Sequence, residues 1–285
     1  MTLVSFSVIY YLLYGNPRRL VIFGWGSVAG FLLTYFINPD EVAAGDPWKW
    51  GLAYPVTWGV CLLASQKRFR GRASIAMVTA VGMLNLVLAF RSLGATCLIA
   101  ALYLFINQMM RRRAARAQKL KKTLILAISA LVLLCGAGIY FGYQFAATSG
   151  LLGEEAQNKN ESQSSGKYGV LLGGRTEMLG YLPAIYDSPI LGHGSWAKDP
   201  KYFIAEREAL AALGYSNAED MSVEDLEVGL IPTHSCLFGA WVDAGILGAL
   251  FWAWMLVITA KALMRVYPAT VSILPIMSLL GFQLL

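Results

Sequence analysis

Two histidines are the side chains of this sequence best suited to proton transfer near neutral pH, because imidazole has an ordinary pKa of about 6.5. The chain has only these two, His193 and His234. His234 follows Thr233, a candidate helix N-cap, at the start of a long apolar run. His193 stands in the turn Pro189-Ile-Leu-Gly-His-Gly194. Either could be a general base, or a hydrogen-bonded residue at a membrane interface, and the sequence leaves both alternatives open.

Arg91 is a candidate anion-binding residue because of where a membrane would place it. The interval from Arg72 to Arg91 spans about 28 Å as a helix, close to the hydrocarbon thickness of a bilayer. Arg91 is therefore expected at the outer boundary, opposite the basic loops of the chain. The alternative is an arginine that ends a helix and extends its head toward water.

Arg175 is a second candidate, in the stretch Gly173-Gly-Arg-Thr-Glu177 before a predicted helix. A helix N-terminus favours anions, and a guanidinium suits bidentate contact with phosphate. The alternative is an ion pair with Glu177 or another acid of the same segment. No Asp-x-Asp pair occurs in residues 142–233, where Asp225-Leu-Glu227 comes nearest, and no P-loop occurs in the chain. We therefore expect neither a metal nor another cofactor.

Asp243 follows His234 by nine positions, which corresponds to about two and a half helical turns. On one continuous helix the two side chains would face opposite sides, so they are not expected to form an acid–base pair. Asp243, with Gly245 and Gly248, is instead predicted to make a close structural contact with a neighbouring helix.

The elements that must position these residues are predicted to be membrane helices. The chain has 285 residues, of which 57% are hydrophobic and 14% charged, a composition typical of polytopic helical membrane proteins. The loops at 15–19, 66–72, 111–122 and 261–265 contain Lys and Arg but no Asp or Glu. By the positive-inside rule these loops are cytoplasmic and the segment 142–233 is external. The basic clusters thus indicate topology rather than nucleic-acid binding.

The predicted architecture is all-α, a polytopic transmembrane bundle of about 6–7 spans with a large, partly helical periplasmic loop. Its parts are N-terminal transmembrane helices in 1–141, the loop 142–233 and C-terminal transmembrane helices in 234–285. In the loop, residues 154–167 are expected to be mobile because they are rich in Ser, Asn and Gln. Helices are predicted over 176–186, over 200–213 after the cap Asp199, and from a capping box at 222–225. The predicted spans are 20–37, 51–65, 73–90, 93–110, 123–141, 234–260 and 266–285.

Three stretches resemble the O-antigen ligase and polymerase family of bacterial membrane glycosyltransferases. The first is Leu88-Ala-Phe-Arg-Ser-Leu-Gly94, similar to the arginine that family members place at the outer end of a helix. The second runs from Gly173-Gly-Arg175 through the turn Pro189–Gly194. The third is His234-Ser followed by Asp243-Ala-Gly245 and Gly248. Their order, sidedness and spacing around one large external loop make the combination specific.

The resemblance implies an inner-membrane glycosyltransferase. Its donor would be a glycan on undecaprenyl diphosphate, with Arg91 and Arg175 binding the diphosphate. His234 would take the proton of the attacking sugar hydroxyl, with His193 as a possible secondary residue. The acceptor would be lipid A core for a ligase, or another lipid-linked glycan for a polymerase. Membrane lipids, but no nucleic acid, are the other expected partners. A transporter of the same lipid-linked glycan and a non-catalytic membrane subunit are the alternatives.

Overall fold

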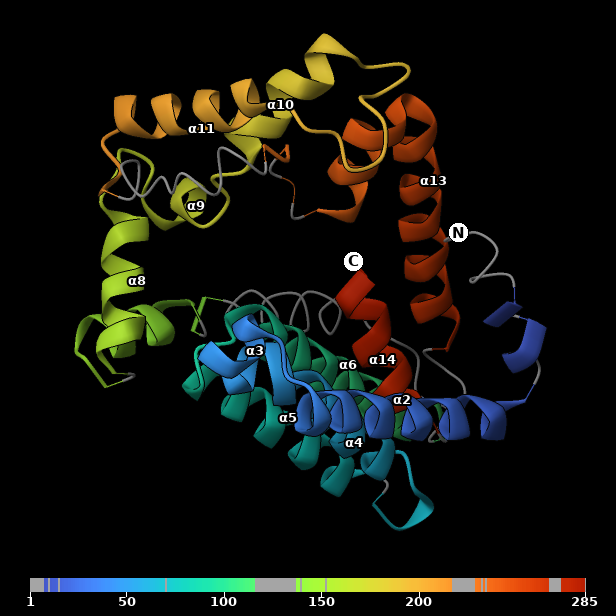
Figure 1. The fold of residues 1–285 in the computed structure, drawn as a ribbon. Coiled ribbons are helices and arrows are strands. Elements are labelled where there is room, and N and C mark those ends of the chain that lie inside the picture. The colour runs from blue at the N-terminus through green and yellow to red at the C-terminus, as the bar shows by residue number, and fades with distance from the viewer. Residues whose placement is uncertain are drawn as a thin grey trace. The chain divides into compact units, whose positions relative to one another are not determined.

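The computed structural model describes residues 8–9, 11–14, 16–69, 71–115, 137–138, 140–151, 153–216, 229–231, 233, 235–266 and 273–284. Within these ranges the protein is all-α, as predicted, and its only β-type pairing is an isolated bridge between Lys198 and Leu230. The chain forms two compact units (Figure 1). Unit 1 is Met1–Tyr140 with Thr259–Leu285, and unit 2 is Phe141–Ile258.

Unit 1 is built from helices that begin and end at local sequence signals. The first of them, α2 (Pro17–Ile37), starts where the Asn16 side chain accepts hydrogen bonds from the next amides and Pro17 takes the first helical position. The other helices are α3 (Glu41–Gly45), the π-helix η1 (Pro47–Leu52), α4 (Ala53–Ala64), the 3-10 helix η2 (Lys67–Phe69), α5 (Arg72–Val87), α6 (Arg91–Ala115) and α14 (Leu274–Leu284).

Small residues let α5 and α6 pack closely in the core of unit 1. A Cβ added to Gly82 would lie 2.9 Å from Cys97 Cβ, and one added to Gly94 would lie 3.0 Å from the Gly82 carbonyl oxygen. The tight connection between the two helices passes through Ala89, which has a positive φ of 58°. Helix α14 packs against α6, and α2 packs against α4. This arrangement fixes the connection that leads into Arg91.

Unit 2 contains α8 (Glu154–Ser164), α9 (Gly169–Gly173), α10 (Met178–Asp187), α11 (Pro200–Ala212) and the larger part of α13 (Cys236–Val266). Most of the segment 154–167, which was predicted to be mobile, forms α8, and its mobility stays a prediction. The predicted helices over 176–186 and 200–213 are confirmed as α10 and α11. At the start of α11 the Asp199 carboxylate accepts a hydrogen bond from the Lys201 backbone amide at 3.1 Å, as expected of an N-cap residue. The capping box at 222–225 lies outside the described residues.

Three of the described helices are long and apolar enough to cross a membrane: Arg18–Ile37, Arg91–Arg112 and Cys236–Met264. They correspond to the predicted spans 20–37, 93–110 and 234–260. Two shorter apolar helices, Arg72–Val87 and Leu274–Leu284, overlap the predicted spans 73–90 and 266–285. Large apolar side chains on α2 are exposed, among them Phe36 at 71% and Ile37 at 77%, as expected of a surface that contacts lipid. These features support a membrane protein.

Candidate functional site

The centre of unit 2 is a break in the apolar helix α13. Gly245 has φ 63° and ψ −152°, a conformation outside the helical region. The turn that contains His193 docks at this break through backbone hydrogen bonds. His193 N donates to Val242 O at 2.7 Å, Gly194 N donates to Asp243 O at 2.9 Å, and Ile246 N donates to Ile190 O at 3.3 Å. The turn thereby satisfies amide and carbonyl groups that an unbroken helix would pair internally.

This break corrects the expectation of one continuous helix through position 243 and beyond. The helix also begins only at Cys236, so position 234 precedes it. Helix geometry therefore does not determine the direction of the His234 side chain relative to that of Asp243. The expected close contact of the Asp243–Gly245 stretch does occur, but its partner is a turn of the polar segment rather than a second helix. Trp241 adds to the contact, because its indole Nε1 donates to Pro189 O at 2.9 Å.

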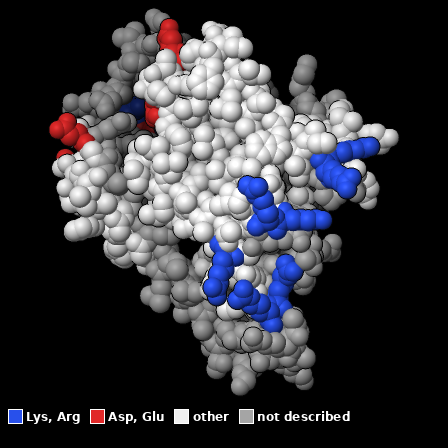
Figure 2. Space-filling model, turned by 90° about the horizontal axis from the view of Figure 1, so that it is seen from below, with Lys and Arg blue, Asp and Glu red and all other residues white. Residues whose placement is uncertain are grey.

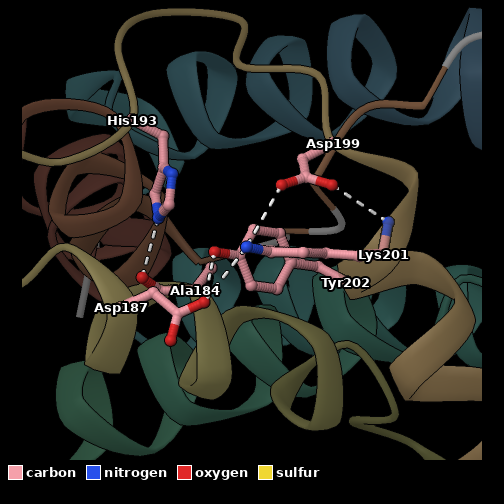
Figure 3. A network of polar contacts seen from close by, with 6 residues as sticks. All are labelled: Ala184, Asp187, His193, Asp199, Lys201 and Tyr202. Carbon is pink, nitrogen blue, oxygen red and sulfur yellow. Dashed lines mark hydrogen bonds and ion pairs between the residues drawn. The ribbon is translucent and has the colours of Figure 1, made fainter.

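His193 is held by α10 and α11 (Figure 3). Its Nε2 lies 2.7 Å from the carbonyl oxygen of Ala184. A carbonyl only accepts, so this nitrogen carries a proton and donates. The Tyr202 ring lies edge-on to the imidazole, with 5.3 Å between ring centroids. This geometry favours the alternative of a hydrogen-bonded structural residue, with Nε2 unable to accept a proton.

A polar network surrounds the same turn. The buried Tyr202 hydroxyl donates to Asp187 Oδ2 at 2.8 Å, and Lys201 Nζ lies 3.2 Å from that oxygen. Lys201 Nζ also lies 3.4 Å from Asp199 Oδ2. The hydrogen bond from Tyr202, then that from Lys201, lowers the pKa of Asp187. The pKa of Lys201 is raised, by its hydrogen bonds with Tyr202 and Asp187. The network therefore keeps both side chains charged at neutral pH.

Arg175 lies in the turn between α9 and α10, where its amide donates to Leu172 O at 2.8 Å. Its side chain is exposed. The alternative of an ion pair between Arg175 and Glu177 stays open.

Tyr181 links the Arg175 turn to the start of α13. Burial raises the Tyr181 pKa, the Glu177 carboxylate raises it further, and the Arg175 guanidinium opposes both. The Tyr181 ring stacks on Phe238 in the first turn of α13, with 4.9 Å between centroids and 15° between planes. Arg175 therefore acts electrostatically on a ring that packs against the beginning of the apolar helix. Sequence reasoning missed Tyr181, and an aromatic residue within an amphipathic helix is a weak signal for such a role.

His234 lies outside the described residues, but unit 2 holds the chain on both sides of it. Before it, Asp199 N donates to Gly229 O at 2.7 Å and Ile231 N donates to Ala197 O at 3.3 Å. After it, the Ser235 hydroxyl accepts the Phe238 amide at 3.4 Å and so caps α13. The predicted cap was Thr233, and the structure corrects it to Ser235. Position 234 thus falls between an anchored segment and a capped helix start.

Arg91 is the first residue of α6 and is half-buried. Instead of ending the preceding helix, it follows a short turn whose last amide, Phe90 N, donates to Asn85 O at 2.8 Å. Arg91 belongs to unit 1, whereas Arg175 and His193 belong to unit 2. The meeting of Arg91 with the other candidates therefore stays a prediction. Within the described ranges, no group of three or more His, Cys, Asp or Glu side chains could hold a metal ion.

Comparisons with known proteins identify no relative of this chain. No protein-family model matches the chain, and no curated protein or solved structure matches it either. The class that the fold supports is an all-α membrane protein, in which a polar helical unit docks on the first part of a broken apolar helix.

Proposed function

We propose that the chain is a bacterial inner-membrane glycosyltransferase of the O-antigen ligase or polymerase type. It would transfer a glycan from an undecaprenyl diphosphate carrier to a sugar hydroxyl. The observation that carries the proposal is the docking of the Pro189–Gly194 turn on the break at Gly245. Two of the three stretches behind the family resemblance thereby form one structural piece beside the start of an apolar helix, where a lipid-linked donor would present its headgroup.

In this proposal His234 is the general base and the arginines bind the leaving diphosphate. The exposed guanidinium of Arg175 suits a role in anion binding, and its influence on Tyr181 relates it to the helix that begins just after His234. Arg91 would contribute a second cation from unit 1. Positive charge from guanidinium groups would stabilise the diphosphate as it departs. His234 would remove the acceptor proton as the hydroxyl attacks the anomeric carbon with inversion.

The proposed topology has about 6–7 spans, with the basic loops cytoplasmic and the loop 142–233 periplasmic. This sidedness matters for the mechanism, because it puts Arg91, Arg175 and His234 on the outer side of the membrane. Labelling of single cysteines by a membrane-impermeant reagent tests it. A cysteine at position 198 should react in intact spheroplasts, and one at position 67 should react only after lysis.

The decisive experiment is in vitro transfer with purified protein, a lipid-linked donor and either lipid A core or a second lipid-linked glycan. Loss of a general base slows reactions by about 10²–10⁴-fold, so His234→Ala should lower the rate by at least that lower bound. Arg91→Ala and Arg175→Ala should abolish detectable product. Lys198→Ala, which removes another exposed cation of unit 2, serves as the matched control. Near-normal transfer by His234→Ala would rule out the proposed mechanism.

The break at Gly245 also favours a second candidate, a transporter of the same lipid-linked glycan, because transporters use discontinuous membrane helices at their substrate sites. At this break, however, a turn of the same chain pairs the backbone groups at the discontinuity. Vesicles that contain the protein and a labelled donor, but no acceptor, separate the two functions. Movement of the donor between leaflets without a new glycosidic bond would support the transporter.

A further inference from the structure

A groove in unit 1 lies between α5 and α6, at the ends of these helices that carry arginines. It has a volume of about 580 Å³. Four lining side chains are apolar, Ile75, Ala76, Phe105 and Met109, and three are polar, Arg72, Gln108 and Arg112. None of these residues belongs to the proposed transferase site. An apolar floor next to two guanidinium groups is the chemistry that would recognise an amphipathic anion.

The cations of the groove are available to a ligand. Arg72 and Arg112 are both exposed, and the ion pairs recorded among the described residues involve neither of them. Arg72 is also the first residue of α5, and the N-cap of that helix, Gly71, supplies no side-chain hydrogen bond. The first amides of α5 add their partial positive charge to that of the guanidinium groups.

The apolar part of the groove is too extensive for an inorganic anion alone. Phe105 is 45% exposed, and Ile75 and Met109 are partly exposed beside it. Gln108 supplies an amide between the apolar and the charged side chains. A phosphate bound by the arginines would leave these apolar side chains uncovered, whereas a phosphate attached to acyl chains would cover them.

The groove lies where helices of this kind meet the membrane surface. Arg112 ends the candidate span Arg91–Arg112, and Arg72 begins the shorter apolar helix Arg72–Val87. The adjoining loops at 66–72 and 111–122 contain no acid that would repel an anion. Figure 2 shows Lys and Arg side chains gathered in one region of the face seen from below. Basic pockets between membrane helices bind anionic lipid headgroups, and the cytoplasmic leaflet supplies such lipids.

We infer that this groove is a binding site for an anionic phospholipid. Its phosphate would lie between the Arg72 and Arg112 guanidinium groups, with the Gln108 amide as a further donor, and an acyl chain would lie along Phe105. The inference concerns unit 1 alone and does not depend on the proposed transferase activity.

Native mass spectrometry of the delipidated full chain in neutral detergent tests this site. The protein is titrated with dioleoylphosphatidylglycerol, and zwitterionic dioleoylphosphatidylcholine provides the comparison. We expect at least tenfold tighter retention of the anionic lipid. The double variant R72Q/R112Q should lose at least tenfold in that retention. The control R68Q/R111Q removes the same charge from exposed positions that do not line the groove, and it should stay within twofold of the wild type.

Three results would overturn the inference. One is an equal loss of lipid in R72Q/R112Q and R68Q/R111Q, which would indicate diffuse electrostatic attraction. The second is equal retention of the two lipids by the wild type. The third is binding of glycerol phosphate, which has the headgroup without the chains, as tightly as the intact anionic lipid. All four arginines are exposed, so their substitution should leave the fold intact. Far-ultraviolet circular dichroism of each variant checks this.

Discussion

Gly192 and Gly245, fifty-three positions apart, meet backbone to backbone in unit 2. A Cβ added to Gly192 would lie 2.5 Å from the Gly245 amide nitrogen, and one added to Gly245 would overlap the Ile190 carbonyl. Both glycines have positive φ, 71° and 63°. Only glycine combines this conformation with so close an approach. The pair therefore holds the polar helices of unit 2 against the broken apolar helix.

Gly192→Ala should destabilise unit 2 by about 3 kcal/mol or more, because a backbone clash adds to the cost of a positive φ. Thermal unfolding followed by tryptophan fluorescence in detergent measures the effect. The matched control is Gly194→Ala in the same turn. Gly194 has φ 91°, but an added Cβ would meet nothing within 4 Å, so this variant should lose only the conformational part, about 1–2 kcal/mol. Equal losses in the two variants would mean that the close approach contributes nothing.

Local signals were sufficient to predict the helix that begins at Asp199-Pro200, because a cap and a proline act within one turn of the chain. The break at Gly245 was missed for a physical reason. Residues 234–260 read as one apolar run, and the hydrogen bonds that stabilise the break come from the turn at 188–194. The glycines inside the run were the only local sign. Likewise, the stacking of Tyr181 on Phe238 depends on tertiary packing that no local pattern encodes.

The candidate site likewise combines features that the sequence predicts with features that only the structure shows. Arg91, Arg175 and His234 were chosen because their chemical types suit diphosphate binding and proton removal, and their roles stay predictions. The structure adds the environment of Arg175, an exposed guanidinium near a tyrosine that packs on α13. No rule about residue spacing predicts this environment. It also gives His193 a structural environment, which the Gly-flanked turn alone left open.

The opposed effects of Arg175 and Glu177 on Tyr181 give a site-specific prediction. With 3-fluorotyrosine incorporated at position 181, fluorine NMR titration reports the pKa of that phenol. Arg175→Gln removes the positive charge that stabilises the phenolate, so it should raise the pKa. Glu177→Gln removes a negative charge and should lower the pKa. Glu208→Gln, a change at an exposed acid of α11, should leave it unchanged. Shifts of the same sign for Arg175→Gln and Glu177→Gln would contradict this arrangement.

The Asp187 network predicts a pH-dependent contribution to stability. The folded-state pKa of Asp187 is lowered by Tyr202 and Lys201. Its ionised form therefore stabilises the fold above the ordinary carboxyl pKa of 3.8, and this contribution is lost as the pH falls through the lowered value. Asp187→Asn should reduce the melting temperature at pH 6, and the difference from the wild type should shrink progressively as the pH falls below 3.8. Glu208→Gln is the control. A difference that persists unchanged at pH 3 would exclude the charge as its origin.

In unit 1, the buried side chain of Asn85 joins three elements. Its Oδ1 accepts from Trp48 Nε1 of η1 at 3.1 Å, and its Nδ2 lies 3.0 Å from Thr57 Oγ1 of α4 and 2.9 Å from the Val81 carbonyl in its own helix, α5. Asn85→Leu introduces an apolar side chain of similar size and leaves the Trp48 indole N–H without this acceptor. Because an unsatisfied buried donor costs about 1–3 kcal/mol, we expect a loss of that order in the free energy of unfolding.

Thr57→Val separates this effect from a general sensitivity of the core. The change keeps the shape of the fully buried Thr57 and removes only one partner of the Asn85 amide, whose second partner, the Val81 carbonyl, remains. It should therefore cost about 1 kcal/mol or less. Denaturant unfolding in mixed micelles, with tryptophan fluorescence as probe, compares the two variants. Equal destabilisation by Thr57→Val and Asn85→Leu would contradict this role of the Asn85 hydrogen bonds. It would mean that the packing of α4 against α5 holds η1 beside the turn that leads into Arg91.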